Sequence, residues 1–434
     1  MFQYISKSIV VLSAVLMLGA CSGTAQTVDD TPLAEYHGLY TPSNTEDVQE
    51  ACHTNHPDYD WGLWGHNLKK ALGGKVSADM YAVVNGKRDS RQLCFSSGKL
   101  YDAVREYIID QFGYGSDTYC ERISIMPMDN KLACTCDRCL KKGNTANNAT
   151  PAVTDFVTRL AKEFPRHKFF TSAYHTTTQA PQNTLPENVG VFVSSISLPM
   201  QVNFRKTNGY KEFLATVKAW KKKCVRIYVW DYERNFDDYL SPFPCLQALQ
   251  SRLQLYRELG VKGVFLNGSG YDYSAFDDMQ TCVLAQMMDN PDLDIHKAVA
   301  DYFRQYYPVT AALLTDYYWT LEERTRTSNR LLPLYGTMKD MCRSYLDAKE
   351  FVRFRSSLDA MSKNTSKDER KRLNALLTAL AYTQLEMYRT GILPKDADMA
   401  VEMREILKGH NELKGMDNRD ETGHTIDEYL KRWE

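Results

Sequence analysis

The sequence lacks the short motifs that identify several large enzyme classes. It contains no G-x-x-x-x-G-K-[ST] phosphate-binding loop, no H-E-x-x-H zinc-protease motif and no G-x-S-x-G nucleophile elbow. Gly268-Ser-Gly270 does not extend to the G-x-G-x-x-G fingerprint of dinucleotide-binding folds, and we interpret it as a turn. Nucleotide-dependent, zinc-protease and serine-hydrolase chemistry therefore have no support, and we expect no cofactor.

Long runs of one charge are also absent. The chain has 53 Lys and Arg against 54 Asp and Glu, which gives a formal net charge of −1. The basic triplet at residues 221–223 lies at the end of a predicted helix, and cations interact favourably with the carboxyl end of a helix dipole. Because nucleic-acid binding depends on neutralising many phosphates, we expect no nucleic-acid partner.

The N-terminal apolar run, Ile9–Leu18, is too short to span a membrane as a helix. Lys7 precedes it and Leu18-Gly-Ala-Cys21 follows it, an order typical of a secretory signal. The last four residues resemble the bacterial lipobox, which implies cleavage before Cys21 and lipidation of that residue. We thus predict a signal peptide over residues 1–20, a tether over 21–34 and a membrane anchor at Cys21. The expected location is the outer membrane, facing the periplasm or the cell surface. The alternative is an ordinary signal peptide with a chance cysteine.

Three of the eleven cysteines lie within six residues, in Cys134-Thr-Cys136-Asp-Arg-Cys139. They could bind zinc with a fourth ligand such as Cys120 or His175, or form a redox-active pair. The third interpretation is a loop with one disulfide or free thiols. Because the sequence shows no second metal half-site, we favour this third interpretation and expect no metal.

Strands and helices alternate through the middle of the chain. Short apolar runs rich in β-branched residues are typical of strands buried on both faces, and five are present: Ile123–Met128, Phe169–Ala173, Val189–Ile196, Val225–Val229 and Val261–Leu266. Two earlier strands are predicted over 58–64 and 80–84. Helices are predicted over 100–112, from Thr150, and over 211–222 and 246–259. This alternation indicates a parallel α/β fold, and we predict an irregular (β/α)₈ TIM barrel over residues 35–309.

The remainder of the chain, residues 310–434, is predicted to be a helical region without a chemical motif. Its expected helices cover 310–324, 339–357, 367–389 and 397–410.

Polar and aromatic residues follow the predicted strands. The carboxyl ends of barrel strands meet at one rim, which carries the active site in TIM-barrel enzymes. Asp129 is our candidate general acid, and Asp231 its catalytic partner, because glycosidases typically use two carboxyl groups. The alternatives are a turn at Asp129 and a loop cap at Asp231. The expected substrate-binding residues are His66, Asn130, Tyr174, His175, Trp230, Tyr232 and Asn267. Trp230 could instead pack inside the barrel, and His175 could be an ordinary surface or core residue.

Several segments resemble a bacterial lipoprotein family first catalogued as a domain of unknown function. The resemblance covers residues 60–307. Its segments are Gln92-Leu-Cys94, Ile123-Ser-Ile-Met-Pro-Met-Asp-Asn130 with the Cys-x-Cys-x-x-Cys loop, Ala173-Tyr-His175, Val229-Trp-Asp-Tyr232 through Pro244, and Gly260-Val-Lys-Gly-Val-Phe265.

Part of that family is glycoside hydrolase family 163, whose members are endo-β-N-acetylglucosaminidases that cut N-glycans. The resemblance implies a TIM barrel and a retaining mechanism in which the acetamido group of the sugar attacks the anomeric carbon. Asp129 takes the place of the proton donor, whereas Met128 stands where an orienting Asn is expected. We therefore expect a glycoside hydrolase acting on complex glycans. The alternative is a non-catalytic glycan-binding surface lipoprotein on the same fold.

Overall fold

The computed structural model describes residues 33–74, 76–327 and 330–433. The predicted signal peptide, the lipidation site Cys21 and nearly all of the predicted tether lie outside these residues. Among the helices of the described chain, none combines the length and the apolar character needed to cross a membrane.

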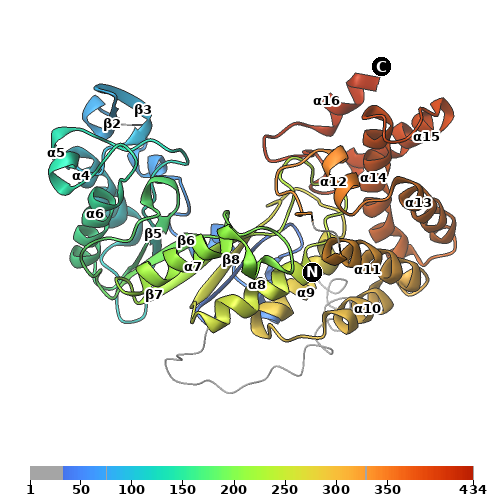
Figure 1. The fold of residues 1–434 in the computed structure, drawn as a ribbon, viewed down its shortest axis with the longest axis horizontal. Helices are drawn as coiled ribbons and strands as arrows, with labels where there is room; N and C mark the ends of the chain where they lie inside the picture. The colour runs from blue at the N-terminus through green and yellow to red at the C-terminus, as the bar shows by residue number, and fades with distance from the viewer. Residues whose placement is uncertain (1–32, 75, 328–329, 434) are drawn as a thin grey trace, which may run out of the picture.

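A six-stranded parallel sheet forms the centre of the molecule (Figure 1). Its strand order is β1-β8-β7-β6-β5-β4, and every neighbouring pair is parallel. All strands therefore present their carboxyl ends at the same edge, as the prediction of a parallel α/β fold requires. The strands are β1 (Tyr36–Tyr40), β4 (Arg122–Ser124), β5 (Lys168–Ala173), β6 (Val189–Ser194), β7 (Arg226–Tyr232) and β8 (Gly263–Asn267).

The two edge strands are connected through one short segment of chain. An isolated bridge joins Gly38 of β1 to Asn55, and another joins Ile123 of β4 to Leu63. The segment between Asn55 and Leu63 is not the predicted strand over 58–64: Pro57–Asp60 forms the short helix α3. The His56 side chain caps this helix by accepting from the Asp58 N–H at 3.3 Å. The predicted eight-stranded barrel is thus observed as a curled six-stranded sheet.

The concave side of the sheet is filled mainly by aromatic rings. Tyr36 of β1 stacks on Tyr228 of β7 with ring centroids 5.8 Å apart, and Phe170 of β5 lies 4.7 Å from Tyr228. Trp61, from the segment that connects the sheet edges, packs against Phe170 at 4.9 Å. The full cluster is Tyr36, Trp61, Met126, Phe170, Phe192, Tyr228 and Phe265. This packing supports the strand ends, because buried rings fill the space beneath them.

Substituting Gly190 by Ala is expected to destabilise the protein by about 1–3 kcal/mol, because overpacking a dense core forces rings off their preferred positions. A Cβ at Gly190 lies 2.2 Å from Cε1 of Phe170. The midpoint of urea unfolding measures the loss. Gly409→Ala is the control, since no heavy atom lies within 4 Å of its Cβ. Equal midpoints for the two variants would contradict this packing.

Helices cover the outer face of the sheet: α6 (Thr150–Glu163) packs on β5 and β6, α7 (Asn208–Lys221) on β6 and β7, and α9 (Asp277–Asp289) on β1. α4 (Gly98–Phe112) and α8 (Leu246–Glu258) also lie within a few residues of their predicted bounds. Local capping explains two of these starts. Ser97 accepts from the Leu100 N–H, and Thr207 accepts from the Tyr210 N–H.

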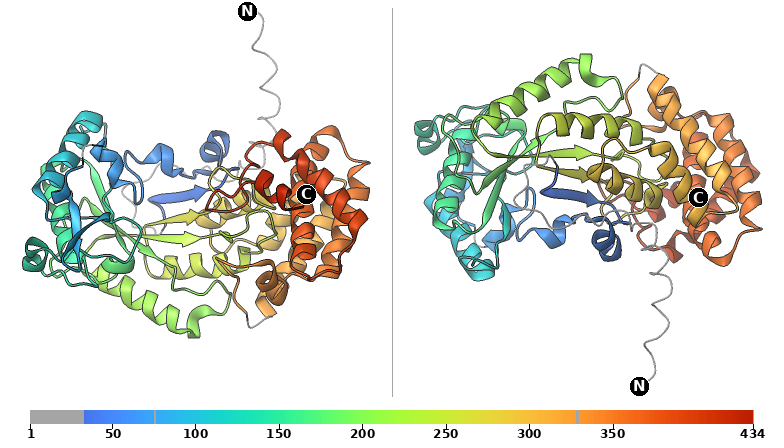
Figure 2. Two further views of the ribbon diagram at one scale, coloured as in Figure 1. Left: turned by 90° about the horizontal axis from the view of Figure 1, so that it is seen from above. Right: turned by 90° about the horizontal axis from the view of Figure 1, so that it is seen from below.

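Two further groups of elements lie at opposite ends of the sheet (Figures 1 and 2). At one end, β2 (Tyr81–Val84) and β3 (Lys87–Leu93) form an antiparallel hairpin near α5 (Asp137–Lys142). The predicted strand over 80–84 is therefore part of this hairpin and not of the sheet.

At the other end of the sheet lie the C-terminal helices. The helix predicted over 339–357 is interrupted there at residues 345–347. The remaining helices are α2 (Glu46–Cys52), α10 (Ile295–Tyr306), α11 (Ala311–Thr327), α12 (Met338–Ser344), α13 (Ala348–Ser362), α14 (Lys367–Arg389), α15 (Ala397–Lys408) and α16 (Ile426–Leu430).

Candidate functional site

A cavity of about 170 Å³ lies at the carboxyl ends of the parallel strands. Its position follows from the sheet, because β5 to β8 each contribute side chains where they end. The structure brings six of the nine predicted catalytic and binding residues into its lining: His66, Asp129, Tyr174, Trp230, Tyr232 and Asn267. Asn130, His175 and Asp231 do not line it. The other lining residues are Met126, Ser172, Phe192, Ser194, Ile196, Tyr335 and Glu421.

Asp129 lies in the loop that follows β4, and the side chain of Gln92 holds this loop. The Gln92 amide donates to the Met128 carbonyl at 3.1 Å and accepts from the Met128 N–H at 3.0 Å. Gln92 is buried, whereas 62% of the Asp129 side chain is exposed. The backbone next to Asp129 is therefore fixed while its carboxylate faces the cavity and solvent.

Asn130 supports the same loop. Its side chain donates to the Arg91 carbonyl at 2.9 Å and accepts from Gln92 at 3.1 Å. These contacts attach the Asp129 loop to β3, and the contact of Asn130 with substrate stays a prediction.

Tyr174 and His175 form a stacked pair beside Asp129. Their ring centroids lie 3.7 Å apart, and His175 Nε2 lies 3.8 Å from an Asp129 carboxylate oxygen. Burial raises the pKa of Tyr174 to about 12, and the charge of Asp129 adds to this effect. Burial lowers the pKa of His175, while Asp129 opposes that shift. Tyr174 is therefore a protonated donor near neutral pH. His175 does not line the cavity but contacts the Asp129 carboxylate, which does.

Aromatic rings form another part of the cavity wall. Trp230 of β7 stacks on Trp64 with ring centroids 5.0 Å apart and planes 10° apart. The rings of Phe265 and Trp230 form an edge-to-face pair with centroids 4.6 Å apart. The Tyr232 hydroxyl lies 3.2 Å from Ser194 Oγ. This combination of a flat apolar surface and fixed hydroxyl groups suits the face of a sugar ring.

Asp231 points away from the cavity, although it lies between two residues that line it. Successive side chains of a strand alternate between faces, so Trp230 and Tyr232 face the cavity and Asp231 faces the outer side. There its fully buried carboxylate accepts from Ser195 Oγ at 2.5 Å and Tyr256 hydroxyl at 2.6 Å, and pairs with Arg252. This geometry does not support the predicted pairing of Asp231 with Asp129.

Glu421 and Tyr335 are cavity residues that the sequence analysis missed, because we expected no chemical motif in the C-terminal region. The Tyr335 hydroxyl donates to Glu421 Oε2 at 3.1 Å, and the Glu421 N–H donates to the Phe236 carbonyl at 2.9 Å. Both residues are solvent-accessible. The packed neighbours of Glu421 nevertheless desolvate its carboxylate and raise its pKa, Tyr335 opposes this shift, and Asp129 adds to it. No strand ends at Glu421, so strand-end patterns gave no signal for it.

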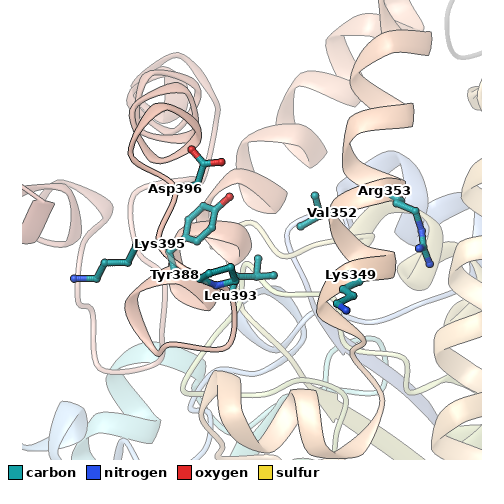
Figure 3. Close-up of a pocket in the computed structure, with 8 residues that line it drawn as sticks. Lys349, Val352, Arg353, Tyr388, Leu393, Lys395 and Asp396 are labelled. Carbon is teal, nitrogen blue, oxygen red and sulfur yellow. The ribbon is translucent and has the colours of Figure 1, made fainter.

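A separate, wider groove of about 650 Å³ lies on the C-terminal helices (Figure 3). It is bordered by α13 and by the segment between α14 and α15, with lining residues Lys349, Val352, Arg353, Tyr388, Leu393, Pro394, Lys395 and Asp396. Its carboxylate, Asp396, caps α15 by accepting from the Met399 N–H at 3.1 Å. The groove therefore lacks the pair of acidic groups that lines the cavity at the strand ends.

Comparisons with known proteins give one family match. Residues 34–320 match the family model described as "Domain of unknown function (DUF4838)". No curated protein matches the chain. A GH138 enzyme targeting pectin rhamnogalacturonan II is among the similar solved structures. It is 9% identical, with 98% of this chain and 85% of that chain covered and a TM-score of 0.36.

Proposed function

The chain belongs to the DUF4838 family, and we propose that it hydrolyses glycosidic bonds in complex glycans at the strand-end cavity. The observation that carries this proposal is the presence of two carboxyl groups, Asp129 and Glu421, in one cavity with the Trp230 ring. The lipid anchor at Cys21 and the outer-membrane location remain predictions from the sequence.

The two carboxyl groups suit the two roles that glycoside hydrolysis needs. One group must be protonated to give its proton to the leaving oxygen, and the other must be ionised to stabilise or attack the anomeric carbon. Desolvation of its carboxylate by packed neighbours and the charge of Asp129 raise the pKa of Glu421, which favours the protonated form. We therefore assign proton donation to Glu421 and the ionised role to Asp129. This revises the sequence-based assignment, which gave the donor role to Asp129.

For the substrate, we propose an N-glycan cut next to N-acetylglucosamine, in line with the resemblance to glycoside hydrolase family 163. Met128 cannot hold an acetamido group, and it does not line the cavity. Asn267, at the end of β8, does line it and offers both an amide donor and an amide acceptor. In this proposal Asn267 orients the acetamido group.

The test is a screen of the purified protein against N-glycans and host polysaccharides, with products identified by mass spectrometry. We expect N-glycan cleavage by the wild type and by Asp110→Asn, a matched change at an exposed position on α4. Asp129→Asn should be inactive. An absence of products from every glycan would reject the hydrolase proposal.

The second candidate function is glycan binding without hydrolysis, and the stacked Trp64–Trp230 pair favours it. Isothermal titration calorimetry with the same glycans separates the two functions. Binding that is unchanged in Asp129→Asn, together with no product in the screen, would identify a binding protein.

Trp230→Ala is expected to raise KM, or the Kd of a binding protein, by about 10- to 100-fold, because the sugar loses its apolar contact surface. The value of kcat should change much less, since contacts made equally in the ground and transition states act on KM. Trp230→Phe retains a ring and serves as the control. A fall in kcat at constant KM would contradict a binding role for Trp230.

A further inference from the structure

Four cysteine sulfurs converge beside the loop that carries Asp129. Cys94 comes directly after β3, Cys134 and Cys136 precede α5, and Cys139 lies within that helix. Their Sγ atoms all lie within 4.8 Å of one another. Cys94 Sγ is 3.7 Å from Cys136 Sγ and 3.8 Å from Cys139 Sγ. Cys94, Cys134 and Cys139 are buried, while Cys136 is partly exposed.

These separations have the size expected for four thiolates around a single ion. A tetrahedron with zinc–sulfur bonds of about 2.3 Å has sulfurs about 3.8 Å apart. A disulfide would bring two sulfurs to about 2.05 Å. An iron–sulfur cluster needs room for several iron atoms between the thiolates, which a group this compact does not provide.

We propose that Cys94, Cys134, Cys136 and Cys139 bind one zinc ion in a structural site. Four protein sulfurs complete the tetrahedral coordination of zinc, so no position is left for water or substrate.

Polar groups around the sulfurs support this assignment. The Val83 N–H donates to Cys134 Sγ at 3.2 Å, and the Ser96 hydroxyl oxygen lies 3.2 Å from Cys139 Sγ. The Val83 N–H stabilises a Cys134 thiolate, and the Ser96 hydroxyl, which accepts from the Cys139 thiol, can donate to Cys139 Sγ once metal binding has removed the thiol proton.

The fourth ligand in this proposal differs from both sequence-based candidates. Cys120 is exposed and lies outside the cluster, and His175 contacts Asp129 instead. Cys94 is distant in sequence from the Cys-x-Cys-x-x-Cys loop, and the hairpin β2–β3 brings it to that loop. The proposal also replaces our expectation of a loop with one disulfide or free thiols and no metal.

The zinc site would connect the hairpin to the Asp129 loop. Next to it, the Thr135 N–H donates to the Val83 carbonyl at 2.8 Å, and Gln92 holds the Met128 backbone. The metal site itself is independent of the proposed function. Only its role in positioning Asp129 rests on that function.

The first test is metal analysis of the purified full chain, prepared without chelators. We expect about one zinc ion per chain. Cys136→Ser changes the partly exposed ligand and should lower the zinc content at least tenfold after dialysis. Cys342→Ser, at another partly exposed cysteine on α12, is the control and should retain zinc. Cobalt exchanged into the wild type and into Cys342→Ser should show thiolate-to-cobalt charge-transfer absorption, which Cys136→Ser should lack.

Three results would overturn the proposal: two disulfides among these cysteines with no metal, iron in place of zinc, or full zinc content in Cys136→Ser. If Cys136→Ser does not fold, the wild type is titrated with a mercurial thiol reagent. Zinc should then leave in step with modification of the four thiols, and release before their modification would place the ion elsewhere. None of these measurements uses a glycan, so their failure is distinguishable from failure of the hydrolase proposal.

Discussion

Glu421→Gln is expected to lower kcat for hydrolysis of a natural glycan by about 10²- to 10⁴-fold, the usual contribution of a general acid. The glutamine amide still accepts the hydrogen bond from the Tyr335 hydroxyl, which lies 3.1 Å from Oε2 in the wild type. The variant therefore keeps the local structure and loses only the transferable proton. Glu412→Gln, at an exposed position in the same C-terminal region, is the control.

The leaving group of the substrate separates the roles of the two carboxyl groups. From an aryl glycoside made with an acidic phenol, the phenolate departs without needing a proton. Glu421→Gln should therefore cleave this substrate at a rate much closer to that of the wild type. Asp129→Asn should lose activity on both substrates, because charge at the anomeric carbon develops in either case. The reverse pattern would return the proton-donor role to Asp129.

The pH profile gives an independent test of the same assignment. A general acid must be protonated, so activity is lost as the pH rises through its pKa. Because the pKa of Glu421 is raised above its usual value, the alkaline limb of kcat/KM should lie at higher pH than for an ordinary glutamate. The hydrogen bond from Tyr335 lowers this pKa, so Tyr335→Phe should move the limb to still higher pH. A limb that stays in place in Glu421→Gln would exclude Glu421 as its source.

Asp231→Ala is expected to lower the free energy of unfolding by about 3–5 kcal/mol, as is typical when one partner of a buried ion pair is removed. Arg252 and Asp231 are both fully buried, so the guanidinium group would lose its counter-charge in a site that water does not reach. The Ser195 and Tyr256 hydroxyl groups would lose their acceptor as well. Guanidinium chloride unfolding of the variant measures this effect.

The control uses a second ion pair on the same helix. Arg257 of α8 pairs with Asp292 at 2.8 Å, and both side chains are exposed. Asp292→Ala should therefore lower the free energy of unfolding far less than Asp231→Ala, because solvent screens an exposed ion pair. If Asp231→Ala kept the stability of the wild type while losing glycan hydrolysis, a catalytic role for Asp231 would be restored.

Much of the sheet could be predicted because its evidence is local. The strands β5 to β8 contain continuous apolar runs, and a run of this kind indicates a buried strand whichever strand it pairs with. The short strand β1 was not predicted, because Tyr36–Tyr40 contains His37 and Gly38 and no β-branched residue. The predicted strand over 123–128 is observed only as Arg122–Ser124, since the chain then leaves the sheet to form the Asp129 loop.

Within the candidate site, most of the residues predicted from strand ends line one cavity, whereas Asp231, the predicted partner of Asp129, does not. Asp129, Tyr174, Trp230, Tyr232 and Asn267 meet because parallel strands end at one edge. The direction of Asp231 depends on which face of β7 covers the interior, and the apolar run before it does not reveal that register.

Amino-acid order thus specified the parallel α/β class, the main helices and the strand ends where polar residues gather, because each depends on neighbours along the chain. Folding in three dimensions added Glu421 to the cavity, Cys94 to the cysteine cluster and Arg252 to Asp231. Each of these partners is distant in sequence, and its contact arises from packing between separate elements. Local periodicity carries no information about such contacts.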